Sequence, residues 1–143
     1  MEERYMITVV GTQTIDGEKD RIEVITAGDM TSDGGKTVIT YPEYSQENPA
    51  QKTDTTVTYD GNILNIDRQG DMASHLILEQ GVRHECLYTT PMGQMFIGIF
   101  TDSVKADIGE DGGRIKAAYQ LDFNRSVVSY NEFEIKLKKK TNE

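Results

Sequence analysis

Apolar residues recur at every second position through most of this chain, and this alternation limits the folds open to it more than any other feature. It is clearest over residues 113–123, where apolar side chains alternate with polar or small ones. Near the end of the chain, Phe133, Ile135 and Leu137 are separated by charged residues in the same way. Because successive side chains of a strand point to opposite faces, each run predicts a strand with one buried and one solvated face.

Turn sequences rich in glycine interrupt the alternating runs at short intervals. Each supplies a residue that tolerates positive φ, as tight hairpins require. They lie at residues 16–17, 33–35, 60–61, 80–81 and 111–113. Between the turns the pattern predicts ten strands, near residues 5–14, 20–31, 36–44, 53–60, 62–69, 73–79, 83–89, 94–108 with a break, 113–123 and 127–139. No window of helical length has helical apolar spacing, so the fold class is all-β.

Eight to ten short strands joined by tight turns favour a single antiparallel up-and-down β-barrel. We prefer it to a sandwich because the up-and-down order closes through short hairpins alone, and closure leaves no exposed edge. A chain of 143 residues has the length of one domain. We therefore expect a single barrel domain over residues 1–143, in which residues 137–143 form a frayed basic tail.

The charge balance limits the classes of partner that the chain can bind. The chain has 15 Lys and Arg against 24 Asp and Glu, a net charge of −9, which is unsuited to a general nucleic-acid surface. No window approaches the roughly 20 apolar residues of a membrane-spanning helix, and the start lacks a signal-peptide pattern. The single cysteine, Cys86, has no partner for an internal disulfide. We expect a cytoplasmic protein that binds neither nucleic acid nor membrane.

The run from Met92 to Phe100 departs from clean alternation, since it is apolar on both faces. Such a strand is expected to be covered on both sides, or bent so that it serves two parts of the core. Gly98 in its middle is the natural site of a bulge. The alternative is that Gly98 leaves room for a ligand beside the barrel wall.

Short segments spread over nearly the whole chain together suggest a family. They are Val10-Gly11-Thr12-Gln13, Glu23-Val24-Ile25-Thr26, Thr90-Pro91-Met92-Gly93, Gly98-Ile99-Phe100-Thr101, Asp111-Gly112-Gly113-Arg114-Ile115 with Tyr119 and Leu121, and Ser129-Tyr130-Asn131. In this order and spacing the chain resembles the YwiB-like bacterial proteins. The resemblance implies a lipocalin-like, calycin-type β-barrel in a cytoplasmic protein of uncharacterised role, and it supplies no catalytic or binding residues. The chain lacks tryptophan and hence the Gly-x-Trp signature of true lipocalins, which argues against an extracellular carrier.

His75, His84 and Cys86 flank one expected hairpin and are good zinc or copper ligands. A two-residue turn would put all three on one face but would mix apolar and charged residues there. A three-residue turn pairs Leu78 with Val82, Leu76 with His84 and Ser74 with Cys86, and it keeps the apolar residues together. We favour the second register, in which His84 is half-buried, His75 is solvated beside Glu85, and no metal or other cofactor is bound.

No set of residues combines a nucleophile, a base and an acid at a workable spacing. Cys86 has only His84 as a neighbouring base, so an inert buried thiol is the expected state. The acidic residues Asp102, Asp107, Glu110 and Asp111 match no calcium-binding loop and indicate a solvated turn. We therefore expect no catalytic residues and no enzyme activity.

Four lysines lie close to the end of the chain, at positions 136, 138, 139 and 140. Without interleaved aromatic residues they are weak support for contact with RNA or a membrane. We interpret them as guards of an exposed edge of the last strand, because lysine is a common means of blunting an unpaired edge.

Two classes of function stay open. The first is binding of a small molecule in or at the mouth of the barrel, where a partly polar interior is expected from Tyr41, Tyr59, His84, Tyr88, Tyr119 and Phe123. The second is a non-catalytic module with a filled barrel that binds a protein partner, for which the polar loop Glu43 to Thr53 is the first candidate. A cavity of a few hundred Å³ favours the first and a filled barrel with an exposed apolar patch favours the second. The sequence is compatible with a monomer or a homodimer.

Overall fold

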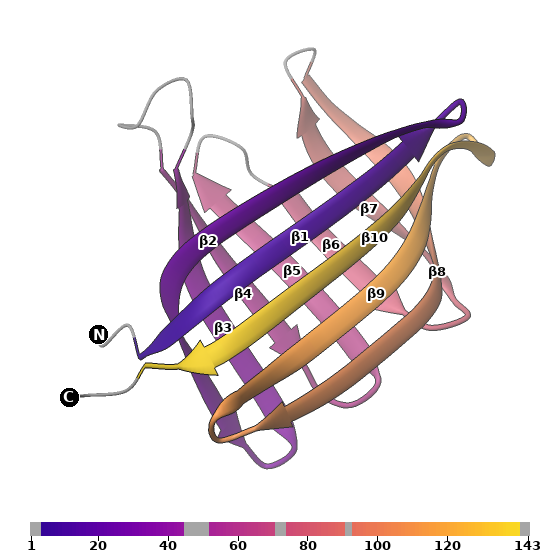
Figure 1. Ribbon diagram of the computed structural model, residues 1–143. Coiled ribbons are helices and arrows are strands. Elements are labelled where there is room, and N and C mark those ends of the chain that lie inside the picture. Colours follow the sequence, from indigo (N-terminus) through magenta and orange to yellow (C-terminus); the bar gives the residue numbers. More distant parts are fainter. Residues whose placement is uncertain (1–3, 45–51, 71–73, 91–92, 141–143) are drawn as a thin grey trace.

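The computed structural model describes residues 4–44, 52–70, 74–90 and 93–140, and ten antiparallel strands account for most of them (Figure 1). Their bounds are β1 Tyr5–Ile15, β2 Glu18–Asp33, β3 Lys36–Tyr44, β4 Lys52–Tyr59, β5 Ile63–Gly70, β6 Ser74–Glu79, β7 Arg83–Thr90, β8 Gly93–Gly109, β9 Gly112–Phe123 and β10 Ser126–Lys139. Each strand pairs with the next along the chain, and β1 also pairs with β10, which closes the barrel. The all-β class and the up-and-down barrel are confirmed.

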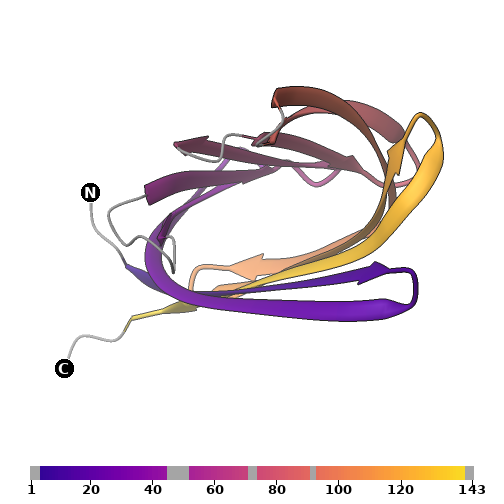
Figure 2. The same cartoon turned by 90° about the horizontal axis from the view of Figure 1, so that it is seen from above.

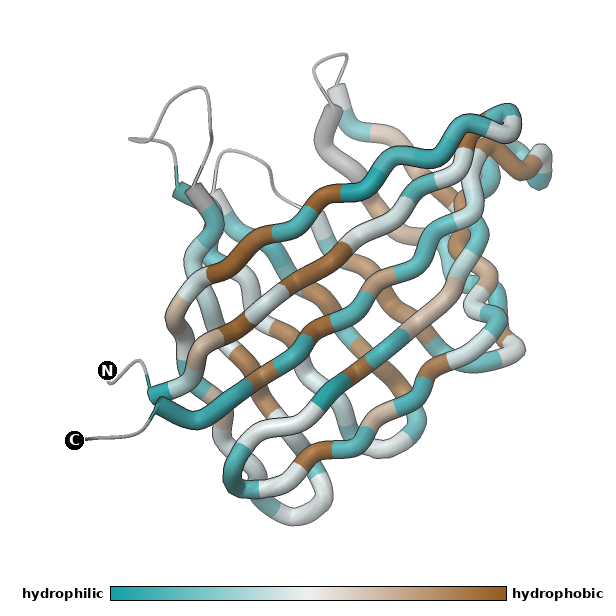
Figure 3. Tube along the Cα trace, viewed as in Figure 1, coloured by the Kyte–Doolittle hydropathy of each residue, from teal (hydrophilic) through white to brown (hydrophobic). Residues whose placement is uncertain are grey.

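The alternation in the sequence becomes the two faces of the barrel wall (Figure 3). Along β10, for example, Phe133, Ile135 and Leu137 are buried while Glu132 and Lys136 between them are exposed. The largest fully buried side chains are mostly Ile and Leu from strands all round the barrel: Ile7, Ile39, Leu64, Ile66, Leu76, Leu78, Ile99, Ile115 and Ile135. These side chains belong to the main hydrophobic core.

The two ends of the barrel differ. At the end we call the closed end, short turns join β2 to β3, β4 to β5, β6 to β7 and β8 to β9 (Figure 1). There Tyr5 Oη donates a hydrogen bond of 2.8 Å to the carbonyl oxygen of Glu110. The other end, which we call the mouth, carries the β1–β2 and β9–β10 hairpins (Figure 1). The view from above in Figure 2 looks into the mouth.

Strand β2 bends, and the bend opens the wall on one side. Its first part, Glu18–Gly28, pairs with β1, whereas only Asp29–Asp33 pairs with β3. The bend lies at Gly28, where a Cβ atom would collide with the carbonyl oxygen of Thr40, with the side chain of Ile7 and with that of Tyr41. A glycine is therefore needed for β2 to pass so close to β3.

The end of the chain differs from the prediction. Strand β10 continues to Lys139 and Leu137 is only 5% exposed, so a frayed tail starting at residue 137 is wrong for residues 137–139. The interpretation of the lysines as edge guards is also wrong, because β10 lies between β1 and β9 and is paired on both sides. Lys136 and Lys138 instead lie on the solvated outer face of a central strand.

The β6–β7 hairpin has the expected faces but a different register. Leu76, Leu78 and Cys86 are buried, and His75 is exposed, as predicted. However, Ser74 pairs with Tyr88 rather than with Cys86, a shift of two residues. The cause is β8, because the turn residues Gly81 and Val82 exchange backbone hydrogen bonds with Thr101 instead of extending the β6–β7 ladder.

Gly98 also has a different role from the one expected. The irregularity in β8 falls between Thr101 and Ser103, and Phe96 is 65% exposed, so the outer face of this strand is not covered. Over Gly98 lies an ion pair that joins β7 to β9: Arg83 donates to both carboxylate oxygens of Asp122, at 2.9 and 2.7 Å. A Cβ atom at Gly98 would overlap both side chains, so the glycine makes room for the ion pair rather than for a ligand.

Candidate mouth cavity

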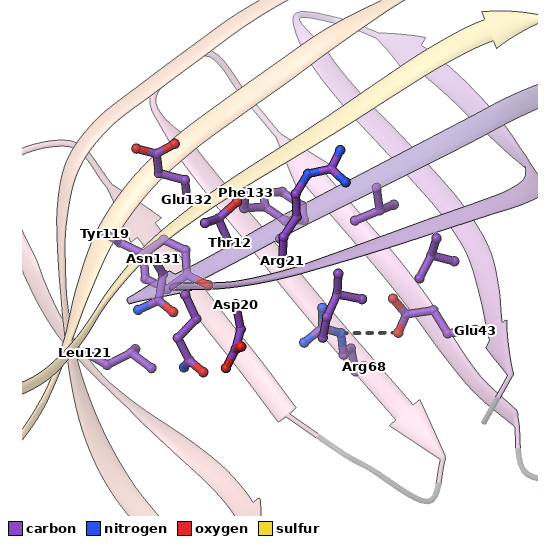
Figure 4. A pocket seen from close by; sticks show the side chains of 15 residues that line it. Thr12, Asp20, Arg21, Glu43, Arg68, Tyr119, Leu121, Asn131, Glu132 and Phe133 are labelled. Carbon is purple, nitrogen blue, oxygen red and sulfur yellow. Dashed lines mark ion pairs between the residues drawn. The ribbon is translucent and has the colours of Figure 1, made fainter. Parts of the chain in front are cut away.

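The described residues do not fill the interior at the mouth, where a cavity of about 650 Å³ opens to solvent. It lies between the front wall, made of β1, β2, β9 and β10, and the opposite wall, made of β3 and β5 (Figure 4). We call it the mouth cavity. Its lining consists of Val9, Gly11, Thr12, Gln13, Asp20, Arg21, Ile22, Val24, Glu43, Arg68, Tyr119, Leu121, Asn131, Glu132 and Phe133.

The front wall offers the cavity a mostly apolar surface. Val9, Leu121 and Phe133 are buried against the core beneath, and Val24 and Tyr119 pack on the same cluster. Further toward the rim the side chains become polar: Gln13 of β1 pairs in register with Asp20 of β2 and with Asn131 of β10. The lining thus changes from apolar at depth to polar at the rim.

A row of polar residues crosses the opposite wall at one level. From β3 to β7, each residue of the row is paired with the next one on the neighbouring strand: Tyr41 with Thr55, Thr55 with Arg68, Arg68 with Ser74, and Ser74 with Tyr88. The row one step nearer the closed end is apolar, with Ile39, Val57, Ile66 and Leu76 in register. This polar row therefore marks the level at which the packed core ends and the mouth begins.

Arg68 and Glu43 point toward each other at the edge of the cavity (Figure 4). Arg68 Nε lies 3.5 Å from Glu43 Oε2, an ion pair without a hydrogen bond, and Thr55 Oγ1 donates to the same carboxylate oxygen at 3.2 Å. The buried Nε of Arg68 therefore has no hydrogen-bond acceptor among the described residues, and neither does the buried hydroxyl of Tyr41. Burial, together with the charge of Glu43, raises the pKa of Tyr41, so its hydroxyl stays protonated.

Gly11 provides part of the free space. It faces Ile22 of β2 and Phe133 of β10 in register, and its neighbour Val9 on the same face is buried. A Cβ atom built on Gly11 would meet no atom within 4 Å. A larger side chain at this position would therefore extend into the cavity rather than into packed protein.

The structure places the six residues that were expected in the interior at different positions. Tyr119 lines the mouth cavity and Tyr41 lies in the polar row beneath its rim. Tyr59 and His84 lie toward the closed end, where His84 Nε2 is 2.9 Å from Glu79 Oε1. Phe123 is wrongly placed by the prediction: it is next to the β9–β10 turn and 44% exposed. The side chain of Tyr88, like most of the loop from Glu43 to Thr53, lies outside the described part of the structure.

The prediction missed Arg68, Glu43 and Gly11. A signal for the first two exists, since Arg68 continues the inward series of Leu64 and Ile66, and Glu43 continues that of Ile39 and Tyr41. A charged residue on the apolar face, near the end of its strand, indicates a solvated interior. The free space beside Gly11 could not be predicted from the sequence, because it depends on which residues lie across the barrel.

The other candidate sites are not assembled. His75 Nε2 lies 3.2 Å from Asn65 Oδ1 rather than beside Glu85. Burial raises the pKa of the Cys86 thiol. Within the described ranges, no group of three or more His, Cys, Asp or Glu residues could hold a metal ion. In the same ranges no helix is long and apolar enough to cross a bilayer.

Comparison with known proteins places this barrel in a family. The family model described as "Domain of unknown function (DUF1934)" matches residues 7–135, which is most of the chain. The chain belongs to this family. Its DUF1934 barrel is similar to the crystal structure of the ywiB protein from Bacillus subtilis, with a TM-score of 0.84 and 21% sequence identity. The match covers 97% of this chain and 93% of that one, and it confirms the resemblance and the fold. A search of curated proteins found no match for this DUF1934 chain.

Proposed function

We propose that this protein binds a small molecule in the mouth of its barrel. The observation that carries the proposal is the mouth cavity itself, whose volume of about 650 Å³ lies within the usual range for small-molecule sites. Its lining joins apolar residues at depth with polar residues at the rim and on the opposite wall, so it offers a small molecule both apolar contact and hydrogen-bond partners. Folds of this kind can be fully packed, so the cavity and not the barrel is the support.

The lining indicates what the ligand has to offer. Val9, Leu121 and Phe133 give contact to an apolar body, and burial of that body is the main favourable contribution to binding. On the opposite side, Arg68 Nε is a buried donor without an acceptor among the described residues. Its ion pair with Glu43 is not a hydrogen bond, so a ligand oxygen that accepts from this N–H would form a charge-assisted hydrogen bond. The ligand therefore has an apolar body and at least one acceptor group.

The competing proposal is a filled barrel that serves as a protein-interaction module. Its support is a set of exposed apolar residues near the tip of the β9–β10 hairpin, at Phe123, Val127, Val128 and Tyr130. The closed half of the barrel is filled as that proposal requires, but the described residues leave the mouth open. We therefore favour ligand binding.

Native mass spectrometry of the protein purified from its own cells tests the proposal. We expect a population heavier than the apoprotein by the mass of one small molecule, which is released on collisional activation. In a Gly11→Phe variant the added ring would fill the cavity, so this population should disappear. Val10→Phe is the matched control, because Val10 lies on the opposite face of the same strand and the same ring would be added outside.

Two outcomes would contradict ligand binding. One is an apoprotein mass for the wild type together with a co-purifying protein, which would favour the interaction module. The other is a bound molecule retained equally by the wild type and by the correctly folded Gly11→Phe variant, which would place the ligand elsewhere.

A further inference from the structure

The first part of β2 has a free edge along the rim of the mouth. Residues Glu18–Gly28 pair with β1 on one side, and no strand in the described part of the chain pairs with their other side. Figure 1 shows this part of β2 as the uppermost strand of the front wall. Ile22 and Ile25 on this strand are 67% and 65% exposed. A long free edge with exposed apolar side chains is a template for pairing with another strand.

The β1–β2 hairpin determines which backbone groups the free edge offers. Its turn consists of Asp16 and Gly17, both with positive φ, and joins the pair Ile15 and Glu18. A two-residue turn of this kind closes on a hydrogen-bonded pair, and such pairs alternate along an antiparallel ladder. The even-numbered residues of β2 therefore bond to β1, and the odd-numbered ones, from Lys19 to Ala27, direct their N–H and C=O groups outward.

We propose that this edge pairs antiparallel with the same edge of a second copy of the chain, about a two-fold axis at Ile22. Only registers that place odd residues opposite odd residues join the outward backbone groups of both copies. Centred on Ile22, the register sets Arg21 of each copy opposite Glu23 of the other, and Lys19 opposite Ile25. The neighbouring permitted registers set Arg21 opposite Arg21 or Glu23 opposite Glu23, which like-charge repulsion disfavours.

The side chains of the edge suit this pairing on both faces. Arg21 and Glu23 lie on the outer face, where Arg21 Nη2 is 3.3 Å from Glu23 Oε2 of the same chain. Both side chains are exposed, so each can form its ion pair with the other copy across the axis instead. Ile22 lies on the inner face at the rim of the mouth cavity, and the axis would bring it against its copy. Pairing would bury both Ile22 side chains and join the two front walls into one continuous sheet. The interface follows the isologous symmetry of most homodimers.

Charge reversals at the edge test this pairing by sedimentation equilibrium over a series of protein concentrations. We expect the wild type to be a reversible dimer. Arg21→Glu alone and Glu23→Arg alone each create two like-charge contacts across the axis, and either should weaken dimerisation at least about ten-fold. The double variant Arg21→Glu/Glu23→Arg should restore the wild-type dissociation constant to within about three-fold. Lys138→Glu, a reversal on the outer face of β10, is the control and should change nothing.

Mixing the two single variants gives the sharpest form of the test. In the mixed pair, the carboxylate introduced by Arg21→Glu in one chain faces the guanidinium introduced by Glu23→Arg in the other. The unchanged Glu23 of the first chain faces the unchanged Arg21 of the second, so two variants that are monomeric alone should form a heterodimer. Loss of the ion pair within each chain cannot produce that result.

Three outcomes would overturn the pairing. They are a wild type that stays monomeric at millimolar concentration, single variants that dimerise like the wild type, and a mixture of the single variants that stays monomeric. Ligand binding is tested separately, by native mass spectrometry of the Gly11→Phe variant, which keeps the charges of Arg21 and Glu23 that the pairing depends on.

Discussion

The closed end and the mouth of this barrel are built by the same strands, yet they hold different interiors. On β3 and β5, Ile39 and Ile66 are fully buried and in contact with the core, whereas a few residues further along, Glu43 and Arg68 border a space that opens to solvent. The alternation of inward and outward side chains continues through both halves. What changes is the size and polarity of the inward residues, so the barrel geometry leaves open whether the interior is filled.

The largest difference between the two ends is expected when an isoleucine is truncated to alanine at each of them. Ile66→Ala at the closed end should lower the free energy of unfolding by about 3–4 kcal/mol, because a fully buried side chain leaves a cavity. Ile22→Ala at the mouth should lower it by less than about 1 kcal/mol at concentrations where the chain is monomeric, because Ile22 contacts solvent in the single chain. Denaturant unfolding monitored by circular dichroism measures both. Equal losses would mean that the two ends are packed alike.

A second comparison uses two glycines on the wall. Gly98→Ala should cost about 2 kcal/mol, because its Cβ atom would displace Arg83 and Asp122 from their paired positions. Gly11→Ala should be neutral or slightly stabilising, because open space surrounds the position and alanine orders a strand better than glycine does. Thermal unfolding of both variants checks this. A destabilised Gly11→Ala would show that the mouth is occupied by protein.

Two ion pairs of the wall, Arg83–Asp122 and Arg68–Glu43, are expected to contribute differently to stability. Hydrogen bonds from Arg83 hold the pKa of Asp122 below its usual value, so the carboxylate adds stability above the unfolded pKa of about 4, and that stability is lost as the pH falls through the folded value. Asp122→Asn should therefore cost about 2 kcal/mol at pH 7 and progressively less below pH 4. Glu43→Gln, at the looser pair of the mouth, should cost less than about 1 kcal/mol.

Unfolding free energies of the two variants measured from pH 7 down to pH 3 give the comparison directly. A constant cost of Asp122→Asn over this range would show that the ion pair does not supply the stability. A larger cost for Glu43→Gln than for Asp122→Asn would reverse the assignment of the two pairs.

The strands were predictable because their signals are local. Alternation over six to ten residues and a glycine at most of the short turns locate a strand without knowledge of its partner, and so the ten predicted ranges lie close to the observed bounds. The register of the β6–β7 hairpin was not predictable, since the turn also bonds to β8: Gly81 N–H donates to the carbonyl oxygen of Thr101, and Thr101 N–H donates to that of Val82. The prediction for Gly98 failed for the same reason, because the ion pair that lies over it joins Arg83 and Asp122 from two other strands.

The site was predictable only in outline. A partly polar interior at the barrel mouth was expected, and Tyr119 lines it. Aromatic residues were given too much weight, as Phe123 shows, and inward-facing charges too little. The bend of β2 at Gly28, which opens the wall, follows from a close approach to Thr40 and Tyr41 that no local pattern reveals.

Titration with the fluorescent probe 8-anilinonaphthalene-1-sulfonate tests the central claim, an open mouth cavity above a packed core, most directly. The probe combines an apolar ring system with a sulfonate whose oxygens are hydrogen-bond acceptors, the two features expected of a ligand of this cavity. We predict saturable binding of one probe per chain for the wild type and for Val10→Phe, and binding at least about ten-fold weaker for Gly11→Phe, with all three proteins giving the same cooperative unfolding transition. Equal binding by all three proteins, or no saturable binding by the wild type, would contradict the claim.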